Sequence, residues 1–171
     1  MNKITEDLLF TFFALFDYFY LSLKNKLESK SINNPNADKQ KLIKKDENSE
    51  ISYSFELTIL KEIIGLFGNI VKNEIHQKPF IEKNMHIVLI DVMLSFIEYP
   101  KIIKNSIGAM INLTTNSDIR DEICKVAAFV KSIHLVLDKY NSTQMIVDYH
   151  LKLLINILKK GNFKEIKISI Y

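Results

Sequence analysis

Three segments of this chain resemble one another and recur at a nearly constant spacing. They are residues 64–70 (IGLFGNI), 107–113 (IGAMINL) and 151–157 (LKLLINI), and each has an asparagine at the same place. The asparagines lie 43 and then 44 positions apart (69 to 112, 112 to 156). Units that repeat at about 20–50 residues cannot bury their apolar faces singly, so they stack on one another. The spacing therefore predicts an array of stacked repeats.

These repeats are predicted to be helical. The chain has only four glycines and three prolines, whereas an all-β protein needs turn residues about every 8–12 positions. From residue 55 onward the apolar residues recur at helical spacing, which indicates helices at 74–84, 85–99, 117–126 and 129–140 and a third asparagine helix that starts near Asn141. We expect Ser117 to cap one helix, Asn141 and Gln144 to form a capping box, and Gly161 to end the last helix.

The remainder of the chain divides by composition. Residues 8–23 (LLFTFFALFDYFYLSL) are strongly apolar, but Glu6 and Asp7 precede them and Asp17 interrupts them. A signal peptide has a basic start, and a membrane span needs about 20 apolar residues. We therefore expect residues 1–30 to form the buried helix of a partial repeat, with a membrane anchor as the alternative. Residues 31–54, rich in Asn, Lys, Ser, Asp and Glu, are predicted to be a flexible polar insertion before repeats at 55–171.

A short helix, a long buried helix and a helix with an L-x-N-L-like signature, repeated about every 40 residues, resembles the armadillo family. The signature is matched by MINL (110–113), FGNI (67–70) and LINI (154–157), and the resemblance covers about residues 55–161. HEAT repeats share the period, so the subtype stays open. The resemblance implies an all-α, right-handed α-solenoid of armadillo-like three-helix repeats, with about two complete repeats and partial end repeats. Exposed repeat ends would favour self-association or a larger array.

The resemblance also implies a binding surface. In armadillo proteins the third-helix asparagines line a concave groove and bind the backbone of an extended peptide, a role that falls here on Asn69, Asn112 and Asn156. An amide offers the donor and the acceptor that such a backbone requires. Helical spacing places five lysines on the same face, which favours an acidic or phosphorylated segment, although a solvated lysine face remains the alternative. These lysines are Lys61, Lys72, Lys104, Lys159 and Lys160, and Asp148 takes the corresponding place in the third segment.

Two features of the armadillo pattern are missing. Readers of basic nuclear signals carry a tryptophan four residues before the asparagine, where this chain has Gly65, Gly108 and Lys152, and it contains no tryptophan. Binding of basic nuclear signals is therefore not expected. The family's glycine between its first two helices is also absent, since residues 83–84 (KN) and 127–128 (AA) occupy those turns.

Several functional classes lack support in the sequence. With 23 basic and 20 acidic residues and Arg120 as its one arginine, the chain is not expected to read nucleic acid, because bidentate contacts to bases favour arginine. Its four histidines and its glycines match no metal, phosphate-loop or nucleophile motif. We therefore expect no enzyme, no metal and no cofactor, and a partner that is another protein or peptide. Cys124 has no second cysteine to pair with, which favours a cytoplasmic setting and leaves a nuclear one open.

Overall fold

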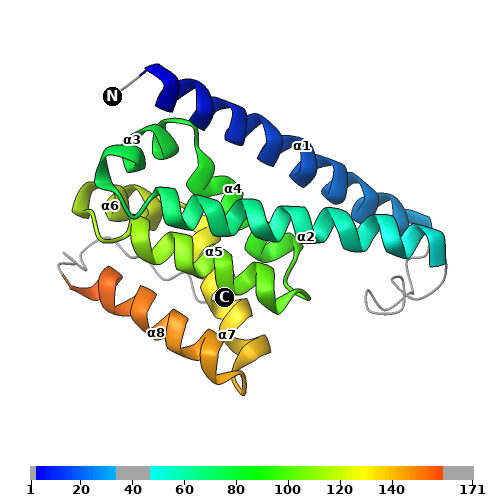
Figure 1. Ribbon diagram of the computed structural model, residues 1–171. Helices are drawn as coiled ribbons and strands as arrows, with labels where there is room; N and C mark the ends of the chain where they lie inside the picture. Colours follow the sequence, from blue (N-terminus) through cyan, green and yellow to red (C-terminus); the bar gives the residue numbers. More distant parts are fainter. Residues whose placement is uncertain (1–2, 34–46, 160–171) are drawn as a thin grey trace. The chain divides into compact units, whose positions relative to one another are not determined.

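The computed structural model describes residues 3–33 and 47–159, and all regular elements in these two stretches are α-helices (Figure 1). The predicted all-α class is thereby confirmed for the described residues. The helices are α1 (Lys3–Asn33), α2 (Glu47–Ile70), α3 (Glu74–Glu82), α4 (Met85–Ser95), α5 (Pro100–Leu113), α6 (Ser117–Lys125), α7 (Ala127–Tyr140) and α8 (Gln144–Leu158). The chain forms two units, one with α1 and most of α2, the other running from Phe67 through α8.

The first unit is built on the apolar N-terminal stretch. Along α1, buried side chains recur every three or four residues, as a helix with one packed face requires. These are Leu9, Phe13, Phe16, Tyr20 and Leu23. The Lys26 ammonium lies 2.7 Å from the Glu56 carboxylate, which joins α1 to α2. No helix in the described part of the chain is long and apolar enough to cross a membrane.

The polar stretch at 31–54 is helical at both ends. α1 continues to Asn33 and α2 begins at Glu47, so the helices extend into the segment that we expected to be a flexible insertion. Lysine and glutamate have good helix propensity, and a packed helix can continue into a polar segment without an apolar face of its own. The middle of the stretch, residues 34–46, lies outside the described residues.

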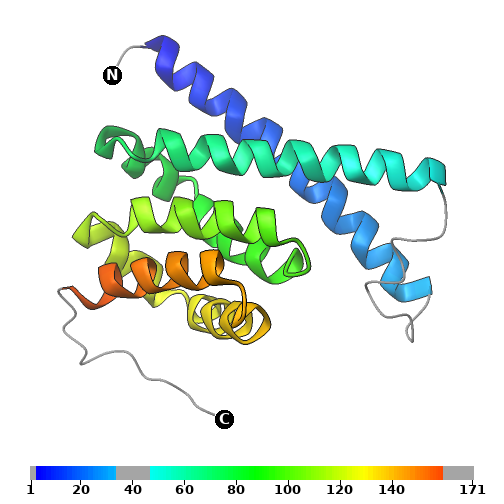
Figure 2. The ribbon, with the colours of Figure 1, turned by 60° about the horizontal axis from the view of Figure 1, so that its bottom comes forward.

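The second unit contains the helices that the apolar spacing predicts. α3, α4, α6 and α7 correspond to the helices expected at 74–84, 85–99, 117–126 and 129–140. The largest difference is that α4 ends at Ser95, because Pro100 starts α5 and a residue before proline is driven out of the helical conformation. Tyr99 accordingly has φ −113° and ψ 90°. Figure 2 shows α8 lying alongside α5.

Two predicted caps are wrong. Asn116, not Ser117, caps α6: its side-chain oxygen accepts hydrogen bonds from the backbone N–H of Asp118 at 3.0 Å and of Ile119 at 3.3 Å. Asparagine is as good an N-cap as serine, and it comes one residue earlier. Asn141 makes no capping box, because it ends α7 and α8 begins only at Gln144. Gly161 lies outside the described residues.

The turn between α3 and α4 contains a residue in the left-handed backbone conformation. Asn84 has φ 57° and ψ 22°, and it is the one non-glycine residue with positive φ in the described ranges. Asparagine tolerates this conformation better than most side chains do.

Candidate functional site

Two of the three predicted asparagines form hydrogen bonds that link neighbouring helices. The side-chain amide of Asn112, on α5, donates to the carbonyl of Gly68 near the end of α2 at 2.8 Å. The amide of Asn156, on α8, donates to the carbonyl of Ile111 near the end of α5 at 3.1 Å and lies 3.4 Å from the Thr114 hydroxyl. Both asparagines are half-buried. They therefore have a structural role that the sequence reasoning did not assign to them.

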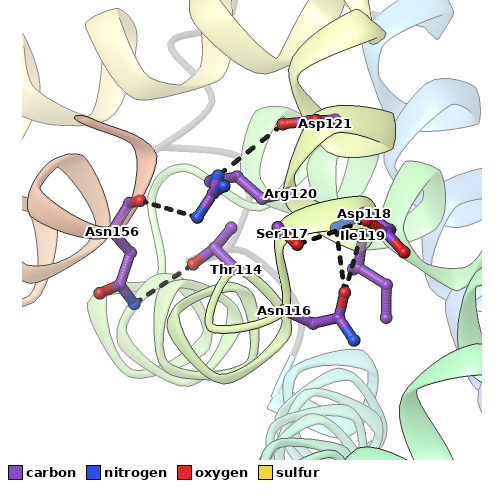
Figure 3. Close-up of polar contacts among 8 residues, drawn as sticks. All are labelled: Thr114, Asn116, Ser117, Asp118, Ile119, Arg120, Asp121 and Asn156. Carbon is purple, nitrogen blue, oxygen red and sulfur yellow. Dashed lines mark hydrogen bonds and ion pairs between the residues drawn. The ribbon is translucent and has the colours of Figure 1, made fainter. Parts of the chain in front are cut away.

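The backbone carbonyls of the same two asparagines accept a second set of contacts. Gln77, on α3, donates to the carbonyl of Asn112 at 3.1 Å and to that of Val71 at 2.9 Å. Arg120, on α6, reaches the carbonyl of Asn156 at 3.5 Å (Figure 3), a long contact. These carbonyls lie in the last turns of α5 and α8, where no N–H of a following helical turn is available. The Asn112 carbonyl also accepts from the Thr115 hydroxyl at 2.6 Å. Positions 77 and 120 differ by 43, the same shift that relates Asn69 to Asn112.

Each of these asparagines keeps hydrogen-bonding capacity. The amide oxygens of Asn112 and Asn156 accept no hydrogen bond from any described residue, and Figure 3 shows that of Asn156 pointing away from Thr114. Asn112 also retains one amide N–H, because a primary amide has two donors. Asn69 is exposed, and its side-chain oxygen accepts from the Lys72 ammonium at 2.8 Å.

A tyrosine that the sequence reasoning missed lies beside these residues. Gly108 makes room for the ring of Tyr149, since a Cβ atom at Gly108 would lie 3.3 Å from the Tyr149 Cε1. The ammonium groups of Lys104 and Lys152 lie 5.8 Å and 5.5 Å from the centre of that ring, within cation–π range. Tyr149 precedes Asn156 by two helical turns, so its position on the same side of α8 was a usable signal.

The predicted lysines make different contacts, and Lys160 lies outside the described residues. Lys72 binds Asn69, whereas Lys104 lies over Tyr149. Lys61 lies in the first unit, where its ammonium is 2.6 Å from the carboxylate of its neighbour Glu62. The surface that the structure assembles is therefore the one shared by α5 and α8, and we call its Lys104, Asn112, Tyr149, Lys152 and Asn156 the amide–lysine surface.

Burial favours the uncharged forms of two histidines and of the half-buried Cys124 in the second unit. Burial lowers the pKa of His86, against a smaller opposing effect of Glu122, and burial lowers the pKa of His150 despite its contact with the Ile146 carbonyl. Burial also raises the pKa of the Cys124 thiol, and the Asp121 carboxylate adds to that shift while Arg120 opposes it. A thiol with a raised pKa has little of the thiolate that acts as a nucleophile. Among the described residues, no three His, Cys, Asp or Glu side chains are grouped to hold a metal.

Comparison of this chain with protein-family models, with curated proteins and with solved structures finds no match.

Proposed function

We propose that the repeats form a right-handed α-solenoid of the armadillo-like kind, with about two complete three-helix repeats and partial end repeats. Support comes from polar contacts that recur at the repeat spacing. Asn73 caps α3 as Asn116 caps α6, and Gln77 occupies the place of Arg120. The same shift of about 43 positions relates the two N-caps to each other, and it relates the two side chains that contact a helix-end carbonyl. A stack of equivalent units produces such a correspondence.

On this architecture, the chain acts as a non-enzymatic scaffold that binds an extended peptide of another protein along the third-helix face. The observation that carries this proposal is that the amide oxygens of Asn112 and Asn156 accept no hydrogen bond from any described residue. An extended peptide presents backbone N–H groups at regular intervals of about 3.3 Å per residue, and an amide oxygen is a suitable acceptor for them. These two oxygens belong to the third helices of successive proposed repeats, so the peptide would bind along that face.

The charge around these oxygens favours an acidic or phosphorylated peptide. Lys104 and Lys152 lie over Tyr149 in the amide–lysine surface, and Lys72 lies beside Asn69. Carboxylates and phosphates form charge-assisted hydrogen bonds with lysine, and cations on a surface also accelerate the encounter with an anionic partner. The partner proposed here is thus an acidic or phosphorylated segment of a protein.

The test is binding of fluorescent peptides of equal length, one rich in Asp and Glu, one with phosphoserines, one neutral and one rich in Lys, followed by anisotropy. We expect the two anionic peptides to bind at least about tenfold more tightly than the neutral one, and Lys104→Glu combined with Lys152→Glu to remove that preference. Lys131→Glu, an exposed lysine on α7, is the matched control and should leave binding unchanged. Equal binding of all four peptides, or equal loss in the control, would contradict the proposal.

A second candidate function rests on α1. Five large apolar side chains on this helix are exposed, namely Leu8, Phe10, Leu15, Tyr18 and Leu21. Such a helix can lie in the interfacial region of a bilayer without crossing it. Co-sedimentation with phosphatidylcholine vesicles that is lost in Phe10→Glu would support attachment through α1, and a protein that stays in the supernatant would exclude it.

A further inference from the structure

α8 has an apolar face that no described residue covers. Leu151, Ile155 and Leu158 are 52%, 51% and 51% exposed, and their spacing of four and three residues puts them on one side of the helix. Asp148 and Lys159, both exposed, lie at the two ends of this row. We call these five residues the α8 face.

The equivalent face of α5 is covered, and α8 is the helix that covers it. The shift of 44 positions that relates Asn112 to Asn156 maps Ile107 and Ile111 of α5, and Thr114 at its C-cap, onto Leu151, Ile155 and Leu158. Ile107 and Thr114 are fully buried. The Ile111 carbonyl and the Thr114 hydroxyl both contact the Asn156 amide. The α8 face therefore repeats a surface that, one unit earlier, packs against a helix.

We propose that the α8 face binds the α8 face of a second copy of this chain, with the two helices antiparallel about a two-fold axis. The opposite charges at the two ends of the α8 face favour the antiparallel arrangement. An antiparallel pair centred between Leu151 and Ile155 brings Asp148 of each copy next to Lys159 of the other copy, because the two residues are almost equally far from that centre. A parallel pair would place like charges together, which opposes association. A self-complementary patch of this kind is what a two-fold dimer requires.

The dimer is tested without any peptide, so its failure and the failure of the proposed peptide binding can be told apart. The test is sedimentation velocity of the full chain over a wide range of protein concentration. We expect a monomer–dimer equilibrium for the unchanged protein and a monomer for Ile155→Glu, since a buried unpaired charge is costly. Val130→Glu, at an exposed apolar position of α7, is the matched control and should still dimerise.

A charge exchange tests the antiparallel register. Asp148→Lys should weaken the dimer about tenfold, because it replaces both ion pairs by repulsion. Adding Lys159→Asp in the same chain should restore the dimer, since the two charges are then exchanged. A monomer at every concentration, a dimer that survives Ile155→Glu through another surface such as α1, or a double variant that is not restored would each overturn the proposal.

Discussion

Asn112 has a structural role that can be measured by its effect on stability. Its amide donates a half-buried hydrogen bond to Gly68, whereas the exposed Asn69 makes no bond to another helix that alanine would remove. Asn112→Ala should therefore lower the free energy of unfolding by about 1 kcal/mol, the usual contribution of one such bond. Asn69→Ala should change it by less than about 0.5 kcal/mol. Urea denaturation of both variants measures the difference, and equal stabilities would show that the Asn112 bond contributes nothing.

The positions of the asparagines could be predicted from their spacing, but their bonds could not. A helical period says that Asn112 and Asn156 occupy equivalent places. Which carbonyl an amide reaches depends on the distance between the two helices, and that distance is set by small residues at their contact. At Gly68 a Cβ atom would lie 3.6 Å from the backbone nitrogen of Ala109, so α2 and α5 approach closely there. That approach brings the Gly68 carbonyl within reach of Asn112.

At the scale of the helices, the α6 cap gives a direct test of where the element begins. The Asn116 side chain accepts from two backbone N–H groups that have no partner within the helix. Asn116→Ala should cost about 1 kcal/mol of stability, the ordinary loss for an N-cap. Ser117→Ala, one residue further along, removes only an exposed contact with Asp118 and should cost less than about 0.5 kcal/mol. Thermal unfolding distinguishes the two, and a larger loss at Ser117 would contradict the observed cap.

Helix type was predictable here, whereas helix ends were less so. The apolar period that predicts α3, α4, α6 and α7 comes from many residues at once, so one unusual residue does not alter it. A helix end depends on one or two residues that compete for the same N–H groups, as Asn116 and Ser117 do. The same competition explains why Asn141, with a glutamine three residues later, looks like a capping box but belongs to the end of α7. At such a site the local sequence is compatible with two helix ends, and the packing of the helices decides which one forms.

For the molecule as a whole, the sequence predicts the all-α class and the order of the helices but does not predict that two units form. The periodic pattern describes each helix and its neighbours, and the division between Leu66 and Phe67 falls inside the continuous helix α2. No composition change marks it, because the polar stretch that we expected to separate the parts lies earlier, at 31–54. Long helices can belong to two packed units, and their sequence then shows no linker.

The stability of the folded chain should fall as the pH drops below about 6.5, the ordinary pKa of histidine. Burial lowers the pKa of His86 and of His150, so the unfolded chain takes up protons at these sites at a higher pH than the folded chain does. The contribution of these two histidines to the free energy of unfolding is complete above about pH 6.5. It is lost progressively as the pH falls toward their lower pKa in the folded state. Asp17 and Asp91, whose pKa burial raises, act in the opposite direction, but only near the ordinary range of a carboxyl group.

Melting temperatures measured between about pH 7.5 and 5.5 isolate this histidine effect, because the carboxyl groups change little over that interval. His150→Leu replaces a fully buried imidazole by an apolar side chain and should flatten the decrease, whatever it does to the stability at neutral pH. His134→Gln, at an exposed position of α7, should leave the decrease as it is. A His150→Leu protein that loses stability with pH as steeply as the unchanged chain would show that this buried imidazole is not what makes the fold sensitive to acid.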